Sequence, residues 1–269
     1  MWNGSRTWRR SSERRGVSVA TIGMLAALIG LAACGGRQEE PPVPQPDPGS
    51  RQLVVVITDG WSATTGWLRR YERVPNHPDW QPVGDSVAVV LGRAGLAWGR
   101  GIRIDPRPGD PIKQEGDEKS PAGEFQLSHA FGYAPPDSAR WLQLAYVSAT
   151  PSLQCVDDPE SPRYNELVYR PAAGPPAWRS AEDMRRSDDA YRWGVVVEHN
   201  SGWAREPGAG SCIFLHVWRG PGSPTVGCTA LELDRLLEVM SWLAPLRTPV
   251  LVQLPRSVYD RVRVEWDLP

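Results

Sequence analysis

The chain has 269 residues, and its 30 lysines and arginines nearly balance 31 aspartates and glutamates, for a net charge of −1. This balance excludes the broad basic surface that nucleic-acid binding needs, so we expect no nucleic-acid partner. The four cysteines and four histidines show no C-x-x-C or H-E-x-x-H spacing. The sequence therefore predicts no metal site and no cofactor.

Residues 1–33 have the pattern of a secretory signal peptide. Five arginines precede the apolar run VSVATIGMLAALIGLAA, which is short for a membrane span. The following LAAC at 31–34 resembles a bacterial lipobox, in which Cys34 would receive the lipid. The alternative is an ordinary cleaved signal with an incidental cysteine. Because two glycines rather than an aspartate follow Cys34, we expect a periplasm-facing protein with a lipid anchor in the outer membrane of a Gram-negative cell.

The rest of the chain divides into three parts. Residues 34–51 are rich in proline and polar residues and lack apolar periodicity, which predicts an extended tether behind the lipidated cysteine. Residues 52–255 are typical in length of one β-rich domain. Residues 256–269 are interpreted as a C-terminal tail.

Short segments rich in β-branched and aromatic residues, bounded by Gly, Pro, Asn or Asp, recur along the domain and predict a mainly β fold. They are QLVVVITDG (52–60), SVAVVLG (86–92), GLAWG (95–99), EFQLS (124–128), WLQLAYV (141–147), WGVVVEHN (193–200), CIFLHVW (212–218) and PVLVQL (249–254). The second and third of these segments are expected to form a hairpin that turns at 93–95.

A few helices complete the expected fold. Leucines and a methionine recur at helical spacing over 230–243, and Thr229 with Glu232 has the pattern of a capping box. A second helix over 180–193 has a weak apolar face. The proline-punctuated stretch 149–178 is interpreted as a surface excursion that borders a cleft.

One cysteine and one histidine flank the loop of FLHVWRGPGSPTVGCTAL (214–231). If Thr229 caps a helix, Cys228 precedes its first turn, where unpaired N–H groups and the helix dipole favour a thiolate. Gly227 leaves room for a substrate carbonyl near the N–H groups of 227–229, which would form an oxyanion site. Strand alternation places His216 on the face shared by Cys212 and Phe214, from which it could act as the base.

A structural interpretation competes with this one, because a lone cysteine is usually a buried apolar residue and a strand histidine is usually satisfied by its neighbours. Ser223 and Thr225 would line the site or form turns, and His199 would bind substrate or cap a strand end. The acids after Cys155, among them Asp157, are either solvated or in contact with substrate amines.

Residues 213–232 resemble the catalytic motif of the L,D-transpeptidase (YkuD-like) family, with IFLH at 213–216 and TVGC at 225–228. KSPAGEFQL (119–127) is similar to the family's TPxGxF strand entry, and PVLVQL falls where the family's domain usually ends. The resemblance implies a β-sandwich-like domain that acts on peptidoglycan stem peptides, with Cys228 as nucleophile, His216 as base and acid, and backbone oxyanion donors near Gly227.

The sequence departs from the family's pattern in three places. Val226 replaces the usual second histidine, Thr229 and Ala230 replace an apolar-Arg or apolar-Asn pair, and the loop between His216 and Cys228 is short. A hydrolase with the same pair is therefore an alternative to a transferase, and a non-catalytic peptidoglycan-binding lipoprotein is another. A thiol-disulfide protein is also considered, although no C-x-x-C pair supports it.

If Cys34 is lipidated and Cys228 must stay reduced in an oxidising compartment, Cys155 and Cys212 remain as disulfide partners. Their bond would tie the 149–178 excursion to the strand of His216.

Overall fold

A computed structural model describes residues 51–75 and 77–269. The expected signal peptide, the lipidation of Cys34 and the tether lie outside these residues, except that Arg51 already belongs to the first strand. The described part of the chain is mainly β, as predicted, with two short α-helices. Neither of these helices is long and apolar enough to cross a membrane.

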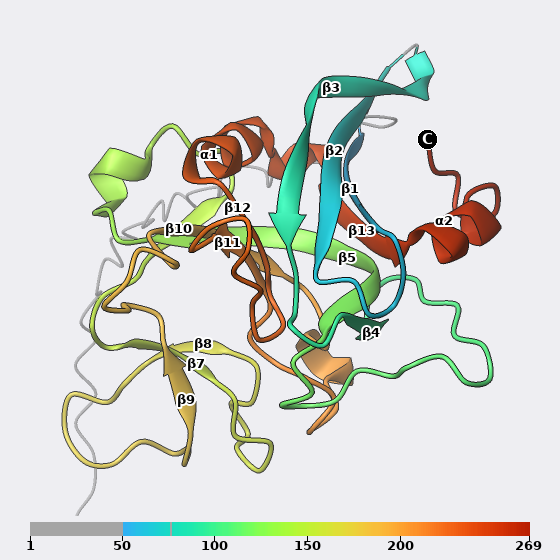
Figure 1. Cartoon of the computed structure of the whole chain (residues 1–269). Helices are drawn as coiled ribbons and strands as arrows, with labels where there is room; N and C mark the ends of the chain where they lie inside the picture. Colours follow the sequence, from blue (N-terminus) through green and yellow to red (C-terminus); the bar gives the residue numbers. More distant parts are fainter. Residues whose placement is uncertain (1–50, 76) are drawn as a thin grey trace, which may run out of the picture. The chain divides into compact units, whose positions relative to one another are not determined.

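The main sheet has ten strands (Figure 1). They are β1 (Arg51–Thr58), β2 (Thr65–Val74), β3 (His77–Val90), β4 (Leu96–Trp98), β5 (Ser120–Gly132), β6 (Ala145–Ser148), β10 (Trp193–Val197), β11 (Phe214–Val217), β12 (Thr229–Leu231) and β13 (Val250–Pro255). The order β10-β11-β12-β3-β2-β1-β13-β5 closes on itself, because β10 also pairs with β5. Closure pairs each of these strands on both sides, although β12 meets β3 only at Ala230 and Val90.

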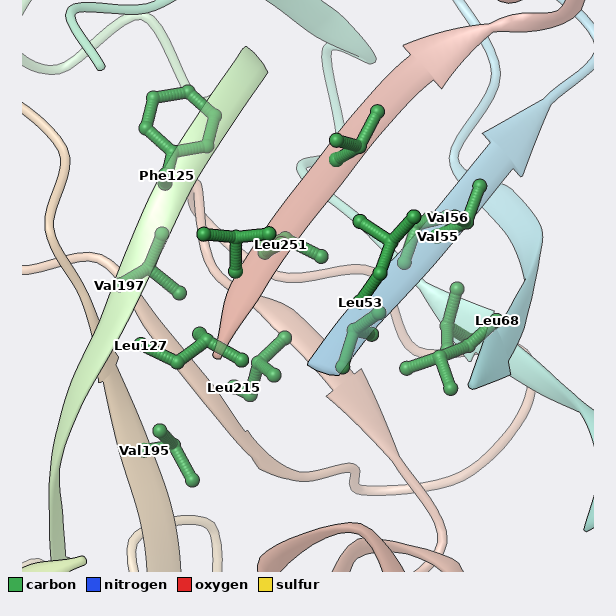
Figure 2. Close-up of a cluster of buried hydrophobic side chains, with 14 of the residues drawn as sticks. Leu53, Val55, Val56, Leu68, Phe125, Leu127, Val195, Val197, Leu215 and Leu251 are labelled. Carbon is green, nitrogen blue, oxygen red and sulfur yellow. The ribbon is translucent and has the colours of Figure 1, made fainter. Parts of the chain in front are cut away.

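The interior of the closed sheet holds the main hydrophobic core. Figure 2 shows Leu251 of β13, Leu127 of β5 and Leu215 of β11 pointing into the same space. Each of these three side chains is at most 1% exposed. Burial of this apolar surface is the dominant force that holds the strands together.

Strand β11 separates two hydrophobic clusters, because its side chains alternate between faces. Leu215 and Val217 face the main core, whereas Phe214 packs in a second cluster with Cys212 and Cys228. The predicted alternation is therefore confirmed, and it directs His216 toward the side of Cys228.

Residues 149–192 form a second, smaller unit of structure rather than an irregular loop. Strands β7 (Leu153–Val156), β8 (Leu167–Tyr169) and β9 (Ala181–Asp183) pair in the order β8-β7-β9 (Figure 1). The predicted helix over 180–193 is wrong, because 181–183 form β9, 184–192 are bends and turns, and residue 193 begins β10. The weak apolar face of this segment left nothing to hold a helix against the core.

The hairpin expected at 93–95 is also wrong. Strand β3 pairs instead with β2 and β12, and β4 pairs in parallel with β5. The turn is present, since the Gly95 amide donates to Gly92 O, but the Leu96 amide donates to Trp61 O rather than back to β3. The turn therefore connects β3, which pairs with β2, to β4, which pairs with β5.

The helix α1 (Leu233–Trp242) begins later than predicted. Residues 229–231 form β12 instead, and the Thr229 hydroxyl donates to Gln253 Oε1 rather than capping a helix. The expected capping box is therefore absent, and the helix does not begin directly after Cys228. Three short 3-10 helices, Pro136–Ala139, Gly202–Ala204 and Pro245–Arg247, connect other elements.

The expected C-terminal tail is part of the domain. It forms α2 (Arg256–Val262), and both Val262 and Trp266 are almost fully buried. Leu268, one residue from the end, is only 9% exposed. The domain boundary predicted at residue 255 was therefore too early.

Candidate active site

Cys228 and His216 line the same pocket, which has a volume of about 130 Å³. His216 lies on β11, and Cys228 ends the loop that leads into β12. These two strands are parallel neighbours, with His216 paired opposite Ala230. The sheet register thus brings two side chains that are twelve positions apart to one hollow.

The Cys228 thiol is buried and held by main-chain groups. The thiol donates to Cys212 O at 3.4 Å, and the Phe214 amide donates to Sγ at 3.3 Å. Burial raises the pKa of the Cys228 thiol to about 12, and the nearby Glu182 carboxylate acts in the same direction. The predicted stabilisation of a thiolate by a helix N-terminus is therefore wrong, because β12 separates Cys228 from α1 and the resting thiol is neutral.

The imidazole of His216 is fixed in one tautomer. Its Nδ1 lies 2.8 Å from Val217 O, and because a carbonyl only accepts, Nδ1 carries the proton. The ring packs edge-on against Tyr191, with ring centroids 5.2 Å apart. Burial lowers the pKa of His216 to about 4. At neutral pH the side chain is thus an uncharged base with its lone pair on Nε2.

The loop before Cys228 is locked by Thr225. Its hydroxyl donates to Cys228 O and accepts from the Gly227 amide, and Ser120 Oγ also donates to Cys228 O. Gly227 has φ +152°, in the region that favours glycine. Thr225 thus positions the main chain on both sides of Gly227. Because the Gly227 N–H donates to this hydroxyl, it is not free to act as the expected oxyanion donor.

The Cys228 amide is the remaining oxyanion candidate. Among the residues that the structure describes, no acceptor for this N–H is present. It belongs to the same residue as the nucleophilic sulfur, so it lies beside any carbonyl that the sulfur attacks.

Sequence reasoning missed a cluster contributed by the small sheet. Tyr191 and Glu182 line the pocket, and the Tyr191 hydroxyl donates to Glu182 Oε1 at 2.8 Å. Arg186 pairs with the same carboxylate at 2.9 Å. Burial raises the pKa values of both Glu182 and Tyr191. The sequence indicated only that polar residues are frequent in the 180–193 segment, whose helical pattern is weak.

A second hollow, of about 390 Å³, meets the first at Cys228. Its lining includes Gly227, one lysine, Lys113, and four carboxylates: Glu115, Glu118, Asp157 and Glu182. Glu115 accepts from two hydroxyl groups, and Asp157 Oδ1 is buried with no hydrogen-bond partner among the described residues. This side of the nucleophile is therefore negatively charged and suits a cationic group.

The expectation that His199 binds substrate is wrong. Both of its ring nitrogens are used, because Nδ1 accepts from the Arg100 amide at 3.1 Å and Nε2 lies 3.0 Å from Ala209 O. It lines neither hollow at Cys228, and burial lowers its pKa to about 3. Ser223 does line the first pocket, where its amide closes a turn with Gly220 O.

Cys155 and Cys212 form a disulfide, which leaves Cys228 as the free cysteine of the described residues. The bond joins β7 to the residues just before β11, as predicted from the roles of Cys34 and Cys228. Asn165 supports the same junction, because its Oδ1 accepts from the Cys212 amide. The small sheet is thereby attached directly beside the pocket.

These features define a mainly β domain in which a reduced, buried cysteine and an uncharged histidine share one pocket. Within residues 51–75 and 77–269, no cluster of histidine, cysteine or acidic side chains could hold a metal ion. No protein-family model, no curated protein and no solved structure matches the chain.

Proposed function

We propose that the protein is a cysteine-dependent acyltransferase of the L,D-transpeptidase type that acts on peptidoglycan stem peptides. One observation carries the proposal: Cys228 and His216 line one pocket, with the imidazole tautomer fixed by Val217 O. A buried cysteine with a purely structural role would need no base of fixed tautomer beside it. The closed sheet is, in this proposal, a version of that family's sandwich-like catalytic domain.

The reaction would proceed by two acyl transfers. Cys228 Sγ attacks the donor carbonyl while His216 Nε2 takes the thiol proton, and the Cys228 amide stabilises the oxyanion. The C–N bond then breaks, the amine leaves with the proton from the imidazolium, and a thioester remains. An acceptor amine attacks this thioester, gives its proton to His216, and displaces the sulfur, which regains the proton.

The second hollow supports an amine acceptor rather than water. Asp157 has a buried carboxylate oxygen without a partner, and Glu115 lies in no ion pair within the described residues. An ammonium group of the acceptor would offset part of this negative charge. Hydrolysis by water is the alternative outcome of the same chemistry.

The experiment is incubation of the protein with defined muropeptides, followed by mass spectrometry. A transferase gives cross-linked products and a thioester on Cys228, whereas a hydrolase gives only shortened peptides. Cys228→Ala should give neither, and it should fold normally because alanine is a small apolar replacement. Turnover by folded Cys228→Ala protein would refute the proposed nucleophile, whereas binding of muropeptides by the wild-type protein without any turnover would leave a peptidoglycan-binding role.

We also propose that a lipid on Cys34 anchors the protein to the outer membrane, facing the periplasm. The support is the LAAC sequence after the apolar signal-type run. Cys34→Ser protein should leave the membrane fraction and lose its lipid mass. Membrane retention without bound lipid would contradict the anchor.

A further inference from the structure

A further hollow lies away from Cys228. It has a volume of about 710 Å³, within the ~300–1,000 Å³ range of small-ligand sites. It shares no lining residue with the two hollows at the cysteine. Its walls are the outer face of β1 and β2 on one side and α2 on the other. We refer to it as the α2 groove.

Strand alternation explains one wall of the α2 groove. In WLRRY (67–71), Leu68 and Arg70 are buried, whereas Trp67, Arg69 and Tyr71 project to the groove. Trp67 is 60% exposed. An indole left in solvent beside a hollow indicates a surface for contact with a ligand.

The second wall, on α2, also carries arginine and aromatic side chains. Arg256, Tyr259 and Arg263 recur at helical spacing along α2 and the turn that follows, and all three line the groove. Guanidinium groups bind carboxylates and phosphates, and aromatic faces bind the C–H faces of sugar rings.

The charge in the α2 groove is not compensated. Asp260 is the acidic side chain in its lining, and it lies 3.9 Å from Arg256. Arg69 and Arg263 have no ion-pair partner among the described residues. A carboxylate at the chain end, on Pro269, would still leave one guanidinium in excess.

We propose that the α2 groove binds a glycan strand that carries carboxylate groups. Trp67 and Tyr71 would stack on sugar rings, the arginines would bind the carboxylates, and Asp260 and Ser86 would accept sugar hydroxyl hydrogens. A polyanion with few hydroxyl donors would make no use of these two acceptors, so a glycan fits the groove better. The net charge of −1 also argues against nucleic acid as the ligand. The site goes beyond the proposed catalytic function and does not depend on it.

The test is calorimetric titration of full-length Cys228→Ala protein, in which no turnover can occur. The probe is a peptide-free hexasaccharide of alternating N-acetylglucosamine and N-acetylmuramic acid, and neutral chitohexaose is the matched ligand control. The carboxylated probe should bind about tenfold more tightly than the neutral one, because only it engages the arginines.

Trp67→Ala and Arg69→Gln should each weaken binding of the carboxylated probe about tenfold. Trp203→Ala and Arg140→Gln are the controls, because both side chains are exposed and lie outside the groove. They should leave affinity unchanged. Thermal unfolding of each variant checks that all four are folded before the affinities are compared.

Equal affinity of the groove variants and the controls, or of the two probes, would overturn the proposal. So would binding to anionic phospholipid vesicles through Trp67 and Arg69 without binding to the hexasaccharide, since the occupant would then be a membrane. Failure of acyl transfer by the wild-type protein leaves this result intact, because the titration measures binding at another surface.

Discussion

The neutral, buried thiol of Cys228 predicts a specific chemical behaviour. Burial raises its pKa from the ordinary 9.0 to about 12. This difference of three pKa units corresponds to about 4 kcal/mol and to a thiolate population about a thousandfold lower at neutral pH. Iodoacetamide should therefore alkylate native Cys228 about a thousandfold more slowly than Cys228 of the urea-unfolded protein with its disulfide intact.

His216 must then supply the missing activation when substrate binds. We expect His216→Ala to slow acylation of Cys228 by a thiol-acylating carbapenem by about 10²–10⁴-fold, because no helix N-terminus can favour the thiolate in its place. The matched control is His129→Ala, since His129 is exposed and lines neither hollow at Cys228.

Two measurements follow the reaction. Intact-mass spectrometry gives the acylation rate, and peptide mapping assigns alkylation to Cys228 between pH 6 and 11. The alkylation rate should rise about tenfold per pH unit up to pH 10 or above, a slope that distinguishes a high pKa from poor access. An alkylation pKa below 9, or acylation of folded His216→Ala protein within tenfold of wild type, would refute the reasoning.

Three further results are expected. Burial lowers the pKa of His199 to about 3 and that of His216 to about 4, so the unfolded state takes up protons first as the pH falls below 6.5. The free energy of urea unfolding should therefore drop by about 3 kcal/mol per histidine between pH 6.5 and 4. Constant stability over that window would contradict this expectation. Replacing Cys155 and Cys212 by alanine should cost about 4 kcal/mol of unfolding free energy, from a loop of 57 residues, and an unchanged urea midpoint would argue against the bond. Gly227→Ala should lose about 1–3 kcal/mol from backbone strain at φ +152°, and slow carbapenem acylation, whereas unchanged stability and rate would show that the loop relaxes freely.

The strands that face the main core were predictable from the sequence. Segments 52–60 and 249–254 contain continuous apolar runs, which are typical of strands buried on both faces. The structure forms β1 and β13 in these segments, and both strands are almost fully buried. Strand β2 and the first half of β3 were missed. Their outer faces are polar or lie on the α2 groove, so TGWLRRYERV reads as a charged segment without a clear period.

The candidate site was predictable only in part. The short spacing of His216 and Cys228 across a glycine-rich loop indicated the pair, and the structure places both in one pocket. The protonation state was not predictable, because it depends on burial by β9 and Tyr191, which approach from another part of the chain. Local sequence at Thr229 favoured a helix cap, but pairing with β11 drew it into β12.

The position of β13 sets the order in which this domain can be built. Leu53 of β1 pairs with Val250 of β13, and β13 pairs on its other side with β5. Until the last strand emerges, β1 and β5 have no neighbour at this point, and the sheet cannot close. Contacts so distant in sequence make folding slow. The sheet of such a chain therefore stays open, with unpaired strand edges, until β13 is available to pair with both neighbours.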